Sequence, residues 1–295
     1  MALFGKILGR TDALQPTPPR AEPKDTQPAQ GGEPASPTAK PMINAADQAR
    51  QAIAAAVGFE QFKRFPNLPG SDEDVLAQIG RSVCARLDAH PAVGRVPATN
   101  IDMFVVRGFV SAQECAEMVS LIDADARRST MLTGGRNEGH RTSSTCDLSS
   151  AHPLVARIEK RISDLLGLPL THSETVQGQR YEIGERFGMH NDYFAGGEAY
   201  SETIASEGGQ RTWTAMVYLN QPEAGGFTNF PRAFAKMPPV AGALLTWNNN
   251  DKSGLSNPYS HHEGMSPEAG RKYILTKWFR EREWRGSGAS DALRV

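Results

Sequence analysis

The stretch Tyr181-Glu-Ile-Gly-Glu-Arg-Phe-Gly-Met-His-Asn-Asp192 ends in a histidine and a carboxylate two positions apart, His190 and Asp192. Residues i and i+2 of an extended strand point to the same face. We therefore expect a strand over residues 190–194, from which both side chains reach one metal ion. A lone H-x-D tripeptide arises often by chance, and the alternative is a histidine bonded to a nearby loop and an aspartate that caps a turn. The surrounding sequence decides between the two.

A third metal ligand is needed, because two side chains do not hold a reactive metal. The strongest candidates are His261 and His262, far downstream of the first pair. Imidazole and carboxylate together suit Fe(II) and other first-row ions better than calcium. Two histidines and one carboxylate form the facial triad, which leaves coordination positions open for substrate and oxygen. The residues alone leave the choice between His261 and His262 open.

The C-terminal stretch Gly270-Arg-Lys-Tyr-Ile-Leu-Thr-Lys-Trp278 predicts a strand with two distinct faces. Alternate residues share one of them: Lys272, Ile274, Thr276 and Trp278. A lysine on an apolar inward face requires an anion, since an unpaired buried ammonium is costly. A carboxylate-bearing cosubstrate beside the metal would be that anion. The alternative is a lysine that extends to solvent at the edge of the strand.

The composition bounds the class of protein. The chain has 295 residues, 32 of them basic and 33 acidic, and a formal net charge of −1. No global field attracts nucleic acid or an anionic membrane, and no stretch approaches the ~18 apolar residues of a membrane span. Residues 1–10 lack the apolar core of a secretory signal. An odd, sparse set of cysteines, Cys84, Cys115 and Cys146, suits a reducing compartment. We expect a cytoplasmic protein that binds neither nucleic acid nor membrane.

The N-terminal part divides into two segments. Residues 1–42 are rich in Pro, Ala, Gln and Thr, and such a composition predicts a disordered tail because it buries too little apolar surface. Residues 43–100 predict helices over 45–62 and 72–87, the second with Ser71 as its N-cap. These helices either flank the main domain or pair between subunits of an oligomer, and the flank is the simpler alternative.

Residues 101–285 form the predicted main domain, followed by a flexible tail over 286–295. Helices are expected over 111–126, opened by a capping box of Ser111 and Glu114, and over 153–166. A polar loop is expected over 134–150. The expected strands span residues 103–110, 175–183, 190–194, 211–219, 240–247 and 272–279. Without alternation of strands and helices, this order predicts an α+β or mainly β fold, with an antiparallel sheet or barrel backed by helices.

Eight motifs over residues 104–280 occur in the order of a known family. They are Phe-Val-Ser-Ala-Gln-Glu-Cys (109–115), Arg-Thr-Ser-Ser (141–144), Val-Ala-Arg-Ile-Glu-Lys-Arg-Ile (155–162), Arg-Tyr-Glu-Ile-Gly (180–184), His-Asn-Asp-Tyr-Phe (190–194), Met-Val-Tyr-Leu-Asn (216–220), Gly-Gly-Phe-Thr-Asn-Phe-Pro (225–231) and Lys-Tyr-Ile-Leu-Thr-Lys-Trp (272–278). The chain resembles the prolyl 4-hydroxylase family of Fe(II)- and 2-oxoglutarate-dependent dioxygenases. The resemblance implies a double-stranded β-helix, a jelly roll of two facing sheets, flanked here by the N-terminal helices.

The resemblance also implies roles for individual residues. His190 and Asp192 match the iron ligands of the family, and its Ser-x-His-x-Gly motif implies His262 as the third. Lys272 matches the lysine that pairs with the distal carboxylate of 2-oxoglutarate. Positions that line the same pocket are matched by Tyr181, Thr228 and Trp278. Positions near the substrate groove are matched by Arg141, Ser143 and Arg211.

The implied reaction hydroxylates a substrate C–H bond and converts 2-oxoglutarate and O2 to succinate. The expected substrate is a prolyl residue in a peptide or protein, with Fe(II) as the metal and ascorbate as its usual support in this family. One alternative is a hydroxylase of small molecules or free amino acids. Another is a non-catalytic module that senses 2-oxoglutarate or oxygen. A halogenase is disfavoured, because halide binding requires the position of Asp192 to be vacant.

Two departures from the family pattern concern the substrate. Phe227 replaces an acidic residue that the family often has in its Gly-Gly-Glu-Thr motif. Residues 196–209 form a longer segment than usual, rich in Gly and Glu, which predicts a loop at the mouth of the site and a candidate lid. The chain also lacks the cysteine pairs and secretory signal of animal collagen enzymes, which argues against collagen processing. These differences leave the substrate open.

Overall fold

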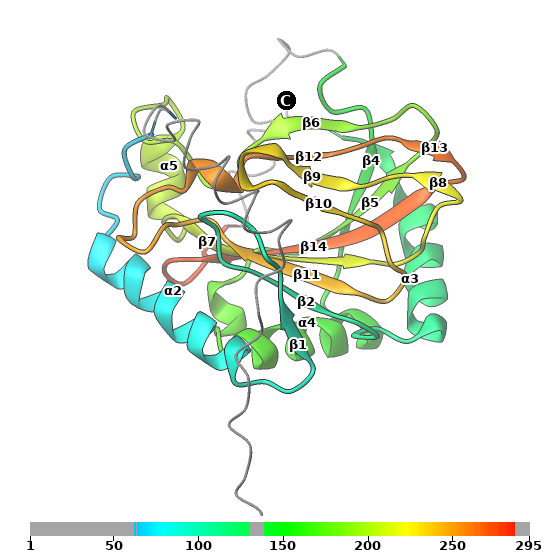
Figure 1. Cartoon of the computed structure of the whole chain (residues 1–295), viewed down its shortest axis with the longest axis horizontal. Coiled ribbons are helices and arrows are strands. Elements are labelled where there is room, and N and C mark those ends of the chain that lie inside the picture. The colour runs from blue at the N-terminus through cyan, green and yellow to red at the C-terminus, as the bar shows by residue number, and fades with distance from the viewer. Residues whose placement is uncertain (1–61, 63, 130–138, 287–295) are drawn as a thin grey trace, which may run out of the picture. The chain divides into compact units, whose positions relative to one another are not determined.

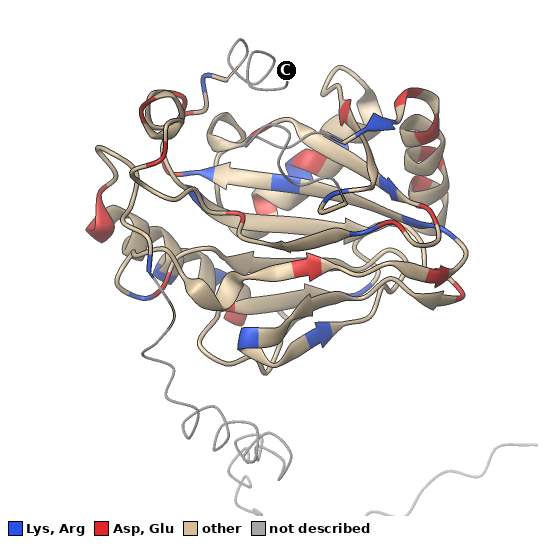
Figure 2. Ribbon diagram, turned by 90° about the horizontal axis from the view of Figure 1, so that it is seen from above, with Lys and Arg blue, Asp and Glu red and all other residues tan. Residues whose placement is uncertain are grey.

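The computed structural model describes residues 62, 64–129 and 139–286, which belong to the unit Ile43–Val295. The tail predicted over 1–42, the helix predicted over 45–62 and the tail predicted over 286–295 lie outside the described residues, apart from Phe62 and Gly286. Among the described residues, no helix has the length and apolarity that crossing a bilayer would need. Acidic and basic residues are interspersed along the strands and helices (Figure 2).

Two antiparallel sheets and a short strand pair make up the β-structure of the described residues. The large sheet has the order β1 (Val93–Arg95), β2 (Met103–Val106), β11 (Leu244–Asn248), β7 (Arg211–Tyr218), β14 (Lys272–Arg280), β5 (Val176–Tyr181), β4 (Ser144–Leu148) and β3 (Arg127–Arg128). The small sheet has the order β10 (Ala235–Met237), β9 (Thr228–Phe230), β12 (His262–Gly264) and β6 (Phe187–His190). β13 (Pro267–Ala269) pairs with β8 (Ala224–Gly225).

The strands follow the topology of a double-stranded β-helix. From β5 onward the chain alternates between the sheets: β6, β9, β10 and β12 lie in the small sheet, and β5, β7, β11 and β14 lie in the large one. The small sheet lies against one side of the large sheet, and helices α3 and α4 cover the other side (Figure 1). The jelly-roll fold predicted from the sequence is therefore confirmed.

Apolar side chains fill both faces of the large sheet because successive residues of a strand point to opposite sides. Val217 and Leu275 pack on the helical side. Their neighbours Met216 and Ile274 pack between the sheets, in one cluster with Phe230 of β9. The space between the two sheets thus lies beside the inward faces of β7, β9 and β14.

The helices are α2 (Glu73–Asp88), α3 (Ala112–Asp125), α4 (Pro153–Leu166) and α5 (Ser201–Ser206), with short 3-10 turns η2 (Leu170–His172), η3 (Pro231–Ala233) and η4 (Pro258–Ser260). α3 begins with the predicted capping box, in which Ser111 and Glu114 each bond the other's backbone amide. α4 has the bounds that its sequence predicts. Pro153 occupies its first turn, and Gly167 ends it at a φ of 69°.

α2 begins one residue later than predicted. Asp72, not Ser71, is its N-cap and accepts from the backbone amides of Asp74 and Val75. Ser71 instead donates to Glu281 at 2.7 Å. An apolar stripe of Val75, Ile79, Val83 and Leu87 is expected from the helical spacing of this segment. Val83 and Leu87 are buried in the core that α4 shares, but Val75 is 42% exposed. α2 therefore packs against the core of the main domain, while the choice between flank and subunit contact for the N-terminal helices stays a prediction.

Several other predicted bounds are wrong. The loop predicted over 134–150 contains β4, whose Thr145, Cys146 and Leu148 are buried where the strand pairs with β5. The strand predicted over 240–247 begins only at Leu244, because Gly242 has a φ of 75° and breaks the extended backbone. Residues 196–209 are not wholly a loop, since α5 lies within them. Ile204 of α5 packs with Leu68 and Phe194, and a lid function for this segment stays a prediction.

The strand expected over 190–194 lies earlier in the chain. β6 covers Phe187–His190, so His190 ends the strand and Asp192 follows it. His190 and Asp192 therefore do not share a strand face, and this prediction is wrong. The turn after His190 nevertheless brings the two side chains together, with 3.7 Å between His190 Nε2 and Asp192 Oδ1.

Candidate metal and cosubstrate site

Three side chains converge between the sheets. His190 ends β6, Asp192 follows it, and His262 begins β12 directly opposite His190 in the antiparallel pairing. Their ligand atoms all lie within 4.8 Å of one another. Asp192 Oδ2 lies 4.0 Å from His262 Nε2. One carboxylate and two imidazoles therefore face a common point, which is the donor set of a facial triad.

Both histidines present the same nitrogen to this point. His190 Nδ1 lies 2.8 Å from the carbonyl oxygen of Gly188, and His262 Nδ1 lies 2.8 Å from that of Ser260. A carbonyl only accepts, so each Nδ1 carries the proton and each Nε2 keeps a free lone pair. Burial lowers the pKa of His190 well below its ordinary value and also lowers the pKa of His262. Both imidazoles are therefore neutral, the form that binds a metal.

Aromatic rings hold the two imidazoles in place. The ring of Phe187 stacks on His190 with 3.6 Å between centroids and an interplanar angle of 8°. Phe230 stacks on His262 at 4.9 Å and 20°. His261 is excluded from the group of ligand atoms although it precedes His262 in the chain. Of the two candidates that the residues alone left open, the structure brings His262 into the cluster.

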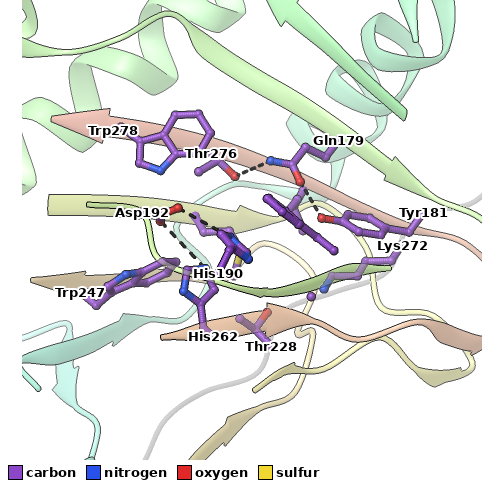
Figure 3. A pocket seen from close by; sticks show the side chains of 14 residues that line it. Gln179, Tyr181, His190, Asp192, Thr228, Trp247, His262, Lys272, Thr276 and Trp278 are labelled. Atoms are coloured by element: carbon purple, nitrogen blue, oxygen red, sulfur yellow. Dashed lines mark hydrogen bonds and ion pairs between the residues drawn. The ribbon is translucent and has the colours of Figure 1, made fainter. Parts of the chain in front are cut away.

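His190, Asp192 and His262, which we call the metal-ligand cluster, line a cavity between the two sheets. Lys272 lies at one end of this cavity, beyond the cluster (Figure 3). Lys272 is 0% exposed, and its ammonium has no hydrogen-bond partner among the residues that the structure describes. The ammonium faces the rings of Tyr181 and Tyr218, at 5.1 and 5.9 Å from their centroids. Burial lowers the pKa of Lys272 to about 7. A buried ammonium without a partner is costly, so this end of the cavity is built for an anion.

Two hydroxyl groups at this end support the same interpretation. Tyr218 donates to Thr228 Oγ1 at 2.8 Å. Because the oxygen of Thr228 accepts this bond, its own proton is free to donate to an anion beside Lys272. Burial raises the pKa of Tyr218, which keeps the phenol protonated and the direction of the bond unchanged.

A second polar row crosses the cavity on β5 and β14. Tyr181 donates to Gln179 Oε1 at 2.6 Å, and Gln179 Nε2 donates to Thr276 Oγ1 at 3.2 Å (Figure 3). Trp278 follows on β14, and within the described part of the chain its buried indole N–H has no hydrogen-bond partner. The alternation predicted for β14 is confirmed, because the four residues of its predicted inward face all line the cavity.

Comparison with known proteins identifies the family. A family model described as the 2OG-Fe(II) oxygenase superfamily matches residues 176–280. Prolyl 4-hydroxylase 5 of Arabidopsis thaliana is 32% identical over 206 residues, which cover 61% of this chain and 69% of that protein. The chain belongs to the prolyl 4-hydroxylase family.

Other proteins of this family show a similar extent of likeness. A putative prolyl 4-hydroxylase of Acanthamoeba polyphaga mimivirus is 29% identical over 182 residues, which cover 61% of this chain and 75% of that protein. The solved structure of a viral collagen prolyl hydroxylase from Paramecium Bursaria Chlorella virus-1 shares 24% identity, with a TM-score of 0.47, over 66% of this chain and 98% of that one. As a member of the prolyl 4-hydroxylase family, the chain is a dioxygenase that uses Fe(II), 2-oxoglutarate and O2.

The residues present fit these cofactors. Two neutral imidazoles and one carboxylate suit Fe(II), and three protein ligands leave positions open for a chelating cosubstrate and oxygen. The partnerless ammonium of Lys272 suits the distal carboxylate of 2-oxoglutarate. Seven of the ten site residues predicted from the sequence line this cavity: Tyr181, His190, Asp192, Thr228, His262, Lys272 and Trp278.

The three residues predicted near the substrate groove are not among those that line the cavity. Ser143 is fully buried, with its hydroxyl 3.1 Å from that of Ser129. Arg141 donates to Gln177 at 2.7 Å and lies over the ring of Phe187.

Arg211 has a different environment. It makes two hydrogen bonds of 2.6 Å to the carboxylate of Glu174 and covers the ring of Trp278 at 4.1 Å. It also donates to the carbonyl oxygen of Asp192 at 3.4 Å. Arg211 therefore supports both a cavity aromatic and the backbone of a metal-ligand candidate.

Other residues of this region were not predicted from the sequence. Gln179 lies two positions before Tyr181 on β5, so strand alternation would have placed it in the cavity. Met216 and Tyr218 follow the same rule on β7. Trp247 gave no local signal, because its contact with His262 arises from the packing of β11 beneath the small sheet.

Proposed function

We propose that this dioxygenase hydroxylates prolyl residues of a peptide or protein and releases succinate and CO2. The observation that carries the proposal is the buried, partnerless ammonium of Lys272 in one cavity with the cluster of His190, Asp192 and His262. The names of its relatives, prolyl 4-hydroxylases, support proline as the substrate. Free amino acids and small molecules are the second candidate class, because the pattern departs from the family at Phe227.

Each residue of the cavity has a proposed part. His190, Asp192 and His262 hold Fe(II), which supplies the activation of O2 when bound. Lys272 pairs with the distal carboxylate of 2-oxoglutarate, and the hydroxyl of Thr228 donates to the same group. Tyr181 keeps its phenol protonated, because burial raises its pKa to about 12. Lys272 and Thr228 would thus hold the cosubstrate at its distal carboxylate, and its keto-acid end would remain available to the metal.

The substrate is proposed to enter on the side of Trp278, at the opposite end of the cavity from Lys272 (Figure 3). An indole face suits the flat, apolar ring of a prolyl residue. Arg211 fixes that indole by stacking on it, and Glu174 fixes Arg211. Arg141 and Ser143 are proposed to shape the adjoining wall, through Phe187 and Ser129 respectively.

Three further proposals concern conditions of action. Ascorbate is proposed to maintain iron as Fe(II), as is common in this class. A cytoplasmic location is supported by the free thiols of Cys84, Cys115 and Cys146, which suit a reducing compartment. Contact between subunits is proposed only for the N-terminal segment before α2. The apolar face of α2 itself packs in the core of its own chain.

The low pKa of Lys272 predicts how cosubstrate affinity depends on pH. Below pH 7 the lysine of the free protein is charged and ready to bind a carboxylate. Above it, binding requires uptake of a proton, so the Kd of 2-oxoglutarate should rise by about tenfold per pH unit. Anaerobic titration of the Mn(II)-loaded protein measures this Kd. In Lys272→Arg the guanidinium stays charged, so the profile should be flat. A flat profile for the wild type over the same range would contradict the role.

The proposed reaction is tested with a panel of proline-containing peptides and free amino acids. Protein, Fe(II), 2-oxoglutarate and ascorbate are mixed in air, and succinate and substrate mass are measured together. The expected result is succinate production that a proline-containing peptide increases, with a gain of one oxygen atom on that peptide. If a free amino acid is hydroxylated and no peptide is turned over, the substrate belongs to the second candidate class, free amino acids and small molecules. Succinate at the level of His262→Ala for every compound would overturn the proposal.

A further inference from the structure

A relay of three hydrogen bonds connects the indole of Trp247 to the carboxylate of Asp192. Trp247 Nε1 donates to Asn249 Oδ1 at 3.1 Å, and Asn249 Nδ2 donates to Thr214 Oγ1 at 2.9 Å. Thr214 Oγ1 then donates to Asp192 Oδ2 at 2.8 Å. All four side chains are between 0 and 4% exposed, so no solvent competes for these bonds. Buried polar chains of this kind are costly when incomplete, and this one is complete.

The register of the large sheet places the members of the relay. Trp247 of β11 and Thr214 of β7 are direct partners across the two antiparallel strands. Asn249 follows β11, and its backbone amide bonds the carbonyl oxygen of Thr212. The side chain of Asn249 therefore bridges a cross-strand pair, and Asp192 receives the last bond from β7.

The chemistry of the indole sets the direction of all three bonds. An indole N–H only donates, so Asn249 must turn its carbonyl oxygen toward Trp247. The amide nitrogen of Asn249 then faces Thr214 and can only donate to it. With its oxygen engaged as an acceptor, Thr214 directs its own proton to Asp192 Oδ2. The donor that reaches the carboxylate is thus specified two residues away.

We propose that Trp247, Asn249 and Thr214 are positioning residues that preset Asp192 for the metal. Asp192 lies beyond the end of β6, so the ladder of the small sheet does not orient it. Thr214 donates to Oδ2, which also lies 4.0 Å from His262 Nε2, while Oδ1 lies 3.7 Å from His190 Nε2, so this bond fixes how the carboxylate is turned between the two imidazoles. This inference rests on the metal-binding role proposed for His190, Asp192 and His262.

Trp247 links the relay to a second ligand candidate. Its ring meets the imidazole of His262 edge to face, with 5.0 Å between centroids and an interplanar angle of 70°. One tryptophan therefore packs against one ligand and orients another through Asn249 and Thr214. Such outer partners fix the direction and basicity of the ligands they touch.

The test compares two buried threonines on paired strands. Thr214→Val keeps the shape of the side chain and removes the bond to Asp192. Thr246→Val is the control, since Thr246 is also 0% exposed and donates to the carbonyl oxygen of Thr214 at 2.7 Å, without reaching Asp192. The readouts are the anaerobic Kd of Fe(II), the Kd of Co(II) and the visible spectrum of bound Co(II), each on the full chain. We expect Thr214→Val to weaken metal binding by about 10- to 100-fold.

Two further variants separate positioning from a general loss of structure. Thr214→Ser retains the hydroxyl and should restore the affinity and Co(II) spectrum of the wild type. Asn249→Leu should cause a smaller loss than Thr214→Val, and the double variant should bind no more weakly than Thr214→Val alone, because both changes act through one bond.

Equal metal affinity of Thr214→Val and Thr246→Val would overturn the relay, and so would failure of Thr214→Ser to restore binding. A wild-type chain that binds neither Fe(II) nor Co(II) would instead overturn the proposed metal site itself. The two failures are therefore distinguishable.

Discussion

Replacement of Lys272 by methionine is expected to weaken binding of 2-oxoglutarate by about 30-fold or more, because loss of one member of a buried charge pair costs about 2–5 kcal/mol. The Kd of Fe(II) should change little, since Lys272 is not part of the ligand cluster. Anaerobic titration, first with Fe(II) and then with 2-oxoglutarate, measures the two affinities separately. Equal losses of iron and 2-oxoglutarate binding would contradict the assigned role.

Lys277 provides a matched control on the same strand. It is also buried, but its ammonium donates to Glu159 and to the carbonyl oxygen of Glu174, both at 2.5 Å. Lys277→Met breaks that pair and should lower the free energy of unfolding by about 3–5 kcal/mol. Lys272→Met removes a charge that has no partner in the cosubstrate-free protein, so it should raise the stability of that form. Urea unfolding without cosubstrate checks these opposite signs.

Replacement of His262 by alanine is expected to reduce turnover by at least about 1,000-fold, since a metal contributes several kcal/mol and each 1.36 kcal/mol is tenfold in rate. His261→Ala removes the same kind of side chain one residue earlier. Its ring is outside the group of ligand atoms, so turnover should stay within about threefold of the wild type, as for most surface changes.

The two variants share composition and net charge and differ only in position. Iron binding, followed by equilibrium titration, should be lost in His262→Ala and retained in His261→Ala. Similar losses in both variants would mean that His262 acts through folding and not as a ligand. Loss of iron binding in His261→Ala alone would identify His261 as the third ligand.

The elements that could be predicted from the sequence are those whose signals are local. α4 carries its start and its stop within its own sequence, at Pro153 and Gly167. β14 shows its faces by alternation, which placed Lys272, Thr276 and Trp278 on the cavity side. The motif order of the family then implied the fold, which a propensity argument alone left as a sheet or a barrel.

The elements that were missed depend on partners far away in the chain. β4 has a polar, hydroxyl-rich sequence typical of a loop, and it is a strand because it pairs with β5. The relay from Trp247 to Asp192 requires the register between β7 and β11, which no local pattern specifies. The cap of α2 differs from the prediction because Glu281, more than 200 positions away, accepts from Ser71.

His190 and Asp192 lie close together, as their spacing predicts, but a shared strand face is not the cause. Two residues at i and i+2 were expected to share a strand face, but β6 ends at His190. Asp192 reaches the cluster through the turn that follows, where Thr214 and Arg211 hold its side chain and its carbonyl oxygen. The H-x-D spacing thus corresponds to a strand end followed by a turn. Thr214 and Arg211 of the neighbouring strand β7 orient Asp192.

The central claim is that this cavity couples 2-oxoglutarate turnover to hydroxylation of a substrate at the iron held by His190, Asp192 and His262. The most direct measurement is one reaction under 18O2, with mass analysis of both products. We expect one labelled oxygen atom in succinate and one in the hydroxylated peptide, in equal amounts, and neither product in His262→Ala. Unlabelled peptide product, or succinate formed equally by His262→Ala, would show that the two conversions are not coupled at this site.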